Sequence, residues 1–114
     1  METYAVKISQ AFGAQASDCA SSIALVCQRK GSAERWIEAL TEAVLSLDQF
    51  PCRYPLVEIE PWRSKGFHRM PVKRHIVYYS VNEEEKVVQV HAVIPREDEP
   101  GERARKSARR LRLK

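Results

Sequence analysis

The sequence lacks acidic residues in two stretches that are rich in basic ones. No Asp or Glu occurs between Glu60 and Glu83, and none follows Glu102. The first stretch carries five Lys or Arg residues and two His, and the segment 103–114 carries seven Lys or Arg. The whole chain has a net charge of +4, so residues 1–102 sum to 4 − 7 = −3. Both basic stretches are therefore candidate contacts for phosphate or acidic protein segments.

Cysteine is scarce, and the motifs that carry metal or cofactor chemistry are missing. The three Cys residues show no CxxC spacing, and the sequence holds no HExxH, GxSxG, P-loop or GxGxxG motif. Cys19 and Cys27 would lie about 12 Å apart along one expected helix, too far for a disulfide. Cys52 differs from the other two because it lies beside Arg53, whose positive charge would lower the pKa of the thiol. We expect no metal, no cofactor and a reduced, cytoplasmic protein.

Long apolar runs are also missing. No stretch approaches the about 20 apolar residues of a membrane span, and the N-terminal residues METYAVKISQ lack the apolar region of a signal peptide. We therefore expect no membrane partner. A chain of 114 residues is long enough for one domain with its own core.

Hydrophobic periodicity predicts six elements of secondary structure. They are a strand at 4–8, a helix with apolar residues from Phe12 to Cys27 that stops at Arg29–Gly31, a helix capped by Ser32 and ended by Phe50–Pro51, and strands at 67–72, 74–81 and 87–94. The second helix carries an apolar stripe of Ala33, Trp36, Ile37, Leu40, Ala43, Val44 and Leu47. This order predicts a two-layer α+β fold, β-α-α-β-β-β, with a helical hairpin packed on one face of a mainly antiparallel sheet.

The three later strands differ in their side-chain patterns. Strand 74–81 is bulky on both faces, which predicts a central position in the sheet. Strand 87–94 alternates, with Val88, Val90, Ala92 and Ile94 on one face and Gln89 and His91 on the other. The segment 52–65 is expected to be a long connection with a short extended piece at 56–59.

Six short features follow one another in a fixed order. They are Tyr4-Ala-Val-Lys-Ile, Trp36 early in the second helix, Leu47-Asp-Gln-Phe50-Pro51, Gly66-Phe-His-Arg-Met-Pro-Val72, Arg74-His-Ile-Val-Tyr-Tyr79, and the final strand closing on Arg96-Glu-Asp98. In this order, the chain resembles the ParE/RelE superfamily of bacterial type II toxin-antitoxin toxins, and the ParE branch more than the RelE branch. The resemblance runs from Tyr4 to about Asp98. We therefore expect a toxin domain at 1–98 and a basic C-terminal tail at 99–114.

The resemblance implies a growth-inhibiting toxin of a plasmid-stabilisation system, with a cognate antitoxin whose C-terminal segment wraps onto it. ParE-like members poison DNA gyrase, whereas RelE-like members cleave mRNA on the ribosome. The expected function is gyrase inhibition, and a ribosome-dependent mRNA endoribonuclease is the alternative, so the question of enzymatic activity stays open. His68 stands where relatives commonly carry Arg, and Ile94 where many carry His. A homodimer also stays open.

A third hypothesis does not use the resemblance. The basic segment 63–75 and the basic tail could bind phosphate in a small nucleic-acid-binding module. Such a contact is sensitive to salt and independent of the nucleotide sequence. For the tail, a solvated extension and an antitoxin contact are alternatives.

Candidate site residues follow from the chemistry of RNA cleavage, which needs a base, cations for the phosphate and an acid. Candidate catalytic residues, for the RelE-like case alone, are His75, His91 and Tyr78; candidate target- or phosphate-binding residues are Arg69, Lys73, Arg74 and Arg96. Each has a structural alternative. Histidines in half-buried strands often serve as hydrogen-bonded structural residues, tyrosines as cross-strand packing partners, and arginines as solubilising charges on an edge strand or as partners of an acidic antitoxin.

The period of a strand places these candidates on two faces. If Val77 and Tyr79 face the helices, Arg74 and Tyr78 lie on the opposite face with His91, and His75 lies at the edge of the core. The face opposite the helices and its arginine rim are expected to be free for a target or a neutralising peptide.

Overall fold

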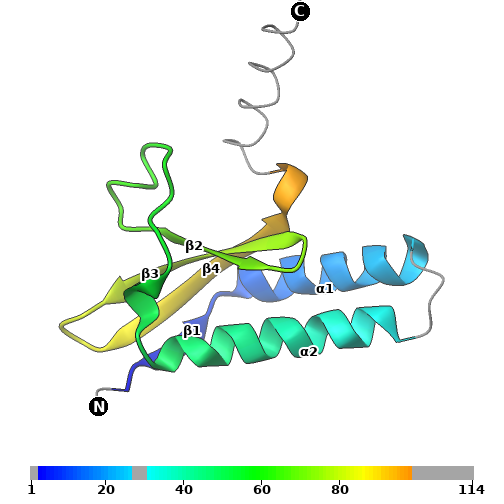
Figure 1. The fold of residues 1–114 in the computed structure, drawn as a ribbon, viewed down its shortest axis with the longest axis horizontal. Helices are drawn as coiled ribbons and strands as arrows, with labels where there is room; N and C mark the ends of the chain where they lie inside the picture. The colour runs from blue at the N-terminus through cyan, green and yellow to red at the C-terminus, as the bar shows by residue number, and fades with distance from the viewer. Residues whose placement is uncertain (1–2, 27–30, 99–114) are drawn as a thin grey trace, which may run out of the picture.

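The computed structural model of the chain describes residues 3–26 and 31–98. In this part of the chain two α-helices pack on one face of a four-stranded sheet (Figure 1). The elements are β1 (Ala5–Ile8), α1 (Gln10–Val26), α2 (Ser32–Leu45), the 3-10 turns η1 (Ser46–Asp48) and η2 (Pro51–Arg53), β2 (His68–Val72), β3 (His75–Asn82), β4 (Val87–Pro95) and η3 (Arg96–Asp98). The predicted fold class is confirmed. The expected tail at 99–114 and the helix stop at 29–30 lie outside the described residues.

The sheet has the strand order β1-β4-β3-β2. Strands β2, β3 and β4 form an antiparallel meander, and β1 pairs parallel with β4. Strand β3 lies between two others, as its bulky pattern predicted. A short segment before β2 adds to the free edge, because Leu56 bridges to His68 and the Arg69 amide donates to the carbonyl of Pro55. The extended piece expected at 56–59 is thus reduced to an isolated bridge.

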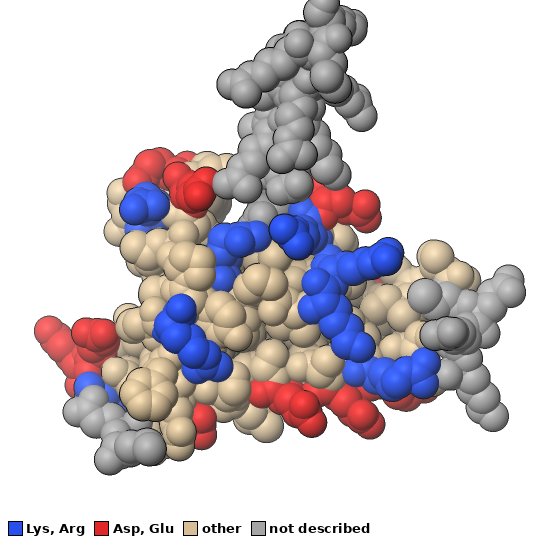
Figure 2. Space-filling view, in the orientation of Figure 1, with Lys and Arg blue, Asp and Glu red and all other residues tan. Residues whose placement is uncertain are grey.

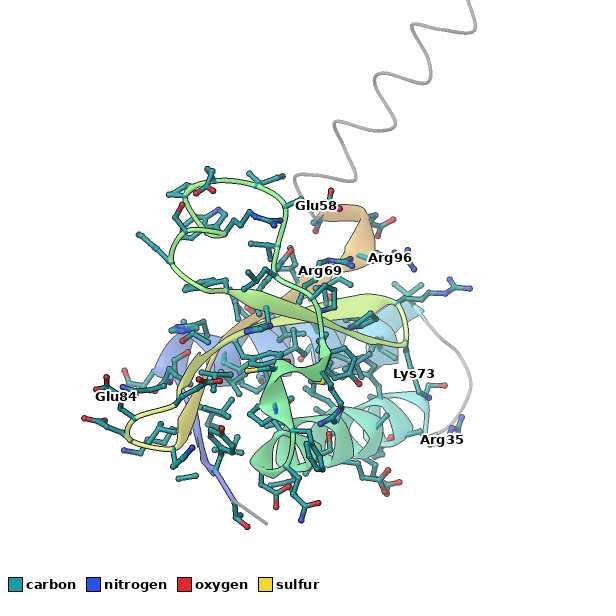
Figure 3. All side chains as sticks on the ribbon, turned by 60° about the vertical axis from the view of Figure 1, so that its left-hand side comes forward. Arg35, Glu58, Arg69, Lys73, Glu84 and Arg96 are labelled. Atoms are coloured by element: carbon teal, nitrogen blue, oxygen red, sulfur yellow. The ribbon has the colours of Figure 1, made fainter. Side chains whose placement is uncertain are left out.

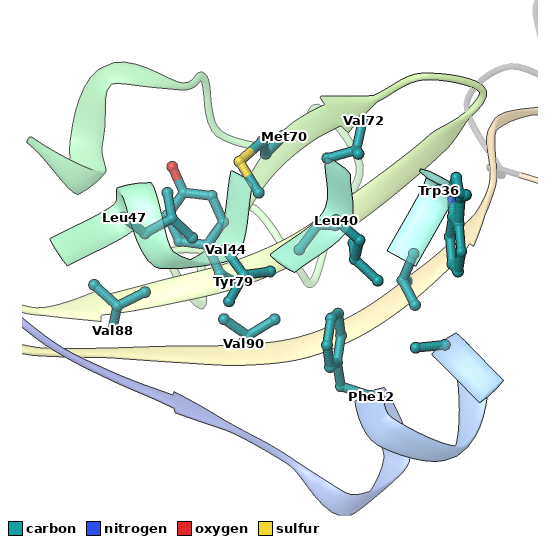
Figure 4. Packing of buried hydrophobic residues seen from close by; sticks show 13 residues of the cluster. Phe12, Trp36, Leu40, Val44, Leu47, Met70, Val72, Tyr79, Val88 and Val90 are labelled. Atoms are coloured by element: carbon teal, nitrogen blue, oxygen red, sulfur yellow. The ribbon is translucent and has the colours of Figure 1, made fainter. Parts of the chain in front are cut away.

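The core lies between the sheet and the helical hairpin (Figure 4). Helix residues Phe12, Trp36, Leu40 and Val44 meet the inward face of the strands, where Met70, Val77, Tyr79, Val88, Val90 and Val93 are almost fully buried. Leu47, in η1, is fully buried too. Ile37 was expected in this stripe, but 37% of it is exposed, because it lies at the margin of the apolar face of α2.

A β-bulge in β4 changes which residues face the helices. Tyr79 pairs with Val90 whereas Tyr78 pairs with Ala92, so His91 is an extra residue in the ladder. The inward face therefore carries Val88, Val90 and Val93, and the prediction of unbroken alternation through Ala92 and Ile94 is wrong. Sequence periodicity cannot reveal an inserted residue when its neighbours are all apolar.

Helix α1 and Ser9, the residue before it, satisfy backbone groups at the bulge. The Ser9 hydroxyl donates to the carbonyl of His91 (2.9 Å) and accepts from the amide of Phe12 (3.0 Å), which caps the helix. The Val93 amide donates to the side-chain carbonyl of Gln15 (3.0 Å). The bulge is therefore held from the helix side, and the His91 side chain is left on the opposite face of the sheet.

Helix α2 begins differently from the prediction. Gly31, not Ser32, occupies the cap position, with φ 82° in the left-handed region, and no side chain caps the helix. The Ser32 hydroxyl instead lies 3.4 Å from Nη2 of Arg35. Glycine adopts this conformation without the steric cost that a Cβ brings, which explains why the helix begins one residue after it.

Within the described residues, no helix has the length and apolar character needed to cross a membrane.

Candidate functional site

The outer face of the sheet, opposite the helices, carries three rows of side chains. In the first row, Phe67 lies next to Ser80 and His91. In the second row, Arg69 lies opposite Tyr78 and Ala92. In the third row, Pro71 lies opposite Ile76 and Ile94. Ile76 is fully buried although it lies outside the helix-facing cluster. The expectation of a free outer face is therefore wrong at Ile76, whereas Lys73, Arg74 and Arg96 at the rim are exposed.

An arginine rim, defined here as Lys73, Arg74 and Arg96 together with Arg69, lies toward one end of this face. The Arg96 amide donates to the carbonyl of Arg74 (2.8 Å), so the start of η3 lies beside the β2–β3 turn. Lys73, Arg74 and Arg96 are exposed, and Arg69 is half-buried. Arg69 sits about 13 Å from the turn, four residues along the strand. The structure thus brings the four predicted binding residues to one region.

Charge is distributed unevenly over the molecule. Figure 2 shows Lys and Arg across the middle of the view, whereas Asp and Glu lie around it, along α2, at the β3–β4 turn, on the loop before β2 and at η3. In Figure 3 the labelled Arg69 and Arg96 side chains lie at the same end of the sheet, opposite to Glu84. The acidic residues of η3 border the rim, and Glu97 is close enough to His75, and Asp98 to Cys19, to influence their pKa values.

His91 is held on the outer face by two neighbours. Its Nε2 lies 2.8 Å from the hydroxyl oxygen of Ser80, and its ring stacks on Phe67 with centroids 4.5 Å apart and planes 11° apart. Trp62 extends this aromatic row, 5.6 Å from Phe67. Burial lowers the pKa of the His91 imidazole, so the ring is neutral at pH 7. A neutral imidazole is a competent base, but packing and a hydrogen bond already fix this one.

His75 lies on the helix side, at the edge of the core as predicted. Its ring centroid is 4.7 Å from that of Trp36, and burial lowers its pKa more than Glu97 raises it. Neither Nδ1 of His75 nor Nε1 of Trp36 has a hydrogen-bond partner among the residues that the structure describes. The strand separates His75 from Tyr78 and His91, so the three candidate catalytic residues do not form one site.

Two of the predicted catalytic residues share the outer face with a cation. Arg69 and Tyr78 are cross-strand partners, and His91 lies in the neighbouring row. Together they supply the residue types for holding a phosphate and moving a proton. Sequence reasoning did not identify the roles of Trp62, Phe67 and Ser80 beside His91. The period-2 spacing of Phe67 and Arg69 was the available signal, but the bulge that sets His91 beside Ser80 has no mark in the sequence.

Cysteine and metal chemistry find no support among the described residues. Cys19 and Cys52 are free thiols. Burial, and then Glu83, raise the pKa of the Cys52 thiol, so the prediction of a lowered value is wrong. The Arg53 guanidinium instead donates to backbone carbonyls. Across residues 3–26 and 31–98, no group of His, Cys, Asp and Glu has the arrangement of a metal site.

Comparisons with known proteins agree with this architecture. The family described as "ParE toxin of type II toxin-antitoxin system, parDE" matches residues 6–100. A solved chromosomal ParDE toxin-antitoxin system from P. aeruginosa aligns with a TM-score of 0.66 at 12% identity, covering 83% of this chain and 98% of that one. The RelBE2 toxin-antitoxin complex from Mycobacterium tuberculosis aligns with a TM-score of 0.62 at 17% identity, covering 86% and 97%.

No curated protein matches the sequence. At these identities the solved structures establish the fold, and the family match, which covers most of the chain, establishes the membership. The chain therefore belongs to the ParE toxin family, within the ParE/RelE superfamily of type II toxin-antitoxin toxins.

Proposed function

We propose that this toxin arrests bacterial growth by binding DNA gyrase, without chemistry of its own, and that the arginine rim contributes to the contact. The observation that carries the proposal is the separation of the candidate catalytic groups. His75 packs against Trp36 on the helix side, while His91 is stacked on Phe67 on the outer face. The exposed cations at the β2–β3 turn fit a binding surface better than a catalytic centre.

The positive charge of the rim suits a large anionic partner. Guanidinium groups bind carboxylates and phosphates through paired hydrogen bonds, so an acidic protein segment and the DNA held by gyrase are both suitable. Lys73 presents its side chain from a left-handed backbone position, φ 55°, in the two-residue turn beside Arg74. A tight turn fixes where these two cations emerge.

A cognate antitoxin is the second proposed partner. The solved relatives include a ParDE system and RelBE complexes, in which a toxin of this fold is found with its antitoxin. The resemblance implies that the C-terminal segment of the antitoxin, which is acidic and apolar, wraps onto the toxin. The rim would then bind either the antitoxin or the target, so that neutralisation follows from competition.

One observation favours a second candidate function, the RelE-like cleavage of mRNA on the ribosome. Arg69, Tyr78 and His91 share the outer face, and a neutral imidazole beside a cation is suited to activating a ribose hydroxyl. For this function, His91 must first break its hydrogen bond with the Ser80 hydroxyl.

Controlled induction of the chain in bacteria tests the proposal. Gyrase inhibition predicts filamentous cells and an SOS response, because stalled gyrase leaves broken DNA. Rapid translation arrest with cut messages would favour the RelE-like function instead, and normal growth would contradict both. The variant His91→Gln sharpens the test, because it removes the candidate base: growth arrest should persist if gyrase is the target and should disappear if His91 is catalytic.

A further inference from the structure

An exposed aromatic residue, Phe50, lies in a backbone conformation that its side chain disfavours. Its φ of 49° and ψ of 53° are left-handed, and 68% of the residue is exposed. Glycine or asparagine adopts this conformation at a lower cost than a bulky residue. The following Pro51 restricts the position further. Neither core packing nor backbone preference therefore explains a phenylalanine here.

The corner around Phe50, residues 46–54, is held by bonds that do not involve the phenyl ring. Nη1 of Arg53 donates to the carbonyls of Ser46 (3.3 Å), Gln49 (2.7 Å) and Phe50 (3.2 Å), and Nη2 donates to the Ser46 hydroxyl (2.7 Å). Pro51 is buried, and its carbonyl accepts the hydroxyl of the buried Tyr79. The turn is thus fixed by its own contacts while the ring is left in solvent.

The charge beside this corner is negative. Sγ of Cys52 lies 3.5 Å from Oε1 of Glu83, which places the β3–β4 turn, with its three consecutive glutamates at 83–85, next to the corner. The nearby cations are engaged within the chain. Arg53 directs its guanidinium to backbone carbonyls, and Nζ of Lys86 lies over the ring of Tyr4 at 5.2 Å. A partner that covers Phe50 therefore meets carboxylates at the margin.

We propose that Phe50 anchors a contact with the protein target of the toxin, at a surface that offers an apolar pocket with Lys or Arg at its rim. The inference rests on the proposed function, because it assumes growth arrest through a bound protein. An aromatic side chain on a fixed turn loses little freedom on binding, and such residues dominate interface energies. The glutamates repel an acidic antitoxin segment, so the target is the occupant that the charges favour.

The test compares Phe50→Asn with a matched control. Asparagine tolerates the left-handed backbone and removes the ring, so the midpoint of thermal unfolding should not fall. Leu25→Asn removes another exposed apolar side chain, 85% exposed on α1, far from the acidic turn in sequence. Growth arrest at equal toxin levels, and inhibition of purified DNA gyrase, should weaken at least about tenfold for Phe50→Asn and stay unchanged for Leu25→Asn.

A second pair of variants tests the charge argument and does not depend on position 50. Glu84→Lys places a cation in the acidic turn and should weaken arrest, because it repels a basic pocket rim. Glu38→Lys makes the same change on the exposed side of α2 and should leave arrest unchanged. Both positions are exposed, so folding should survive either substitution.

Several outcomes would overturn the proposal. Full growth arrest by Phe50→Asn would overturn it. If the variant no longer co-purified with tagged antitoxin, the corner would be a contact for the antitoxin and not for the target, which would overturn the proposal too. If Phe50→Asn does not fold, Phe50→Gly and Glu84→Lys decide the matter by the same readouts. A wild-type chain that does not arrest growth contradicts the proposed function and this inference with it. Arrest without gyrase inhibition contradicts the gyrase target alone, and the growth comparison still decides on Phe50.

Discussion

The two ends of strand β3 differ in charge and in construction. At the end that begins with His75, exposed cations emerge from a two-residue turn and from η3, and the Arg96 amide donates to the carbonyl of Arg74 between the two segments. At the end that closes with Asn82, three glutamates border a corner that is fixed by Arg53, Pro51 and a buried tyrosine. At the cationic end, we expect growth arrest to depend on charge. At the acidic end, we expect the stability of the fold to depend on rigid packing. The two ends should therefore respond differently to substitution.

Removing packing at the acidic end should have the largest effect on stability. Leu47 is fully buried beneath the corner, so Leu47→Ala should lower the free energy of unfolding by about 2–5 kcal/mol. Leu45, two residues earlier and 61% exposed, is the matched control, and Leu45→Ala should change the free energy by less than about 0.5 kcal/mol. Urea unfolding of both variants measures the difference, and equal losses would refute the packing account of the corner.

Removing the clamp that fixes the corner should have the next largest effect. Arg53→Ala deletes the donors to three carbonyls, and because the residue is solvent-exposed we expect a loss of about 1–2 kcal/mol. In a Phe50→Gly background the loss should shrink by about 0.5–1 kcal/mol, since glycine needs no support in the left-handed region. A double-mutant cycle by urea unfolding measures this coupling. Additive losses would show that Arg53 does not support the conformation of Phe50.

Acidification should destabilise the protein through two half-buried imidazoles, those of His75 and His91. Burial lowers the pKa of His75 and of His91 below the ordinary value of about 6.5. The unfolded chain therefore binds more protons than the folded chain, so stability rises with pH in this window and is lost as the pH falls below about 6.5. Imidazole NMR titration should give low midpoints for both residues, and His91→Gln should flatten unfolding stability between pH 7.5 and 6. Midpoints above 6.5 would contradict the burial argument.

Neutralising the cationic end should have the smallest effect on stability and a large effect on function. Arg74→Ala and Arg96→Ala should each change the free energy of unfolding by less than about 0.5 kcal/mol, because both side chains are exposed. Growth arrest should weaken in the double variant and stay intact in Lys7→Ala, whose exposed lysine lies on β1, at the opposite edge of the sheet from β2. Equal weakening by Lys7→Ala would show that the rim acts only through the net charge of the chain.

The difference between the two ends also explains what could be predicted from the sequence. The cationic end was predictable, because Arg69, Lys73 and Arg74 fall in a strand-turn-strand pattern without any acidic residue. The corner was not, because the contact of Arg53 with three carbonyls depends on how the chain turns after α2. The bulge at His91 was hidden for a related reason: the amide of Val93 is satisfied by Gln15, on a distant helix. Local patterns identified the elements, and tertiary contacts decided the details of the site.

Inhibition of DNA supercoiling by purified gyrase tests the central claim most directly. The wild-type toxin should inhibit the reaction in a dose-dependent manner, and the Arg74→Ala/Arg96→Ala double variant, shown by urea unfolding to be folded, should need a much higher concentration. Inhibition by the wild type that the double variant fully retains would contradict the role of the rim. Absence of inhibition by a folded wild-type toxin would contradict gyrase as the target.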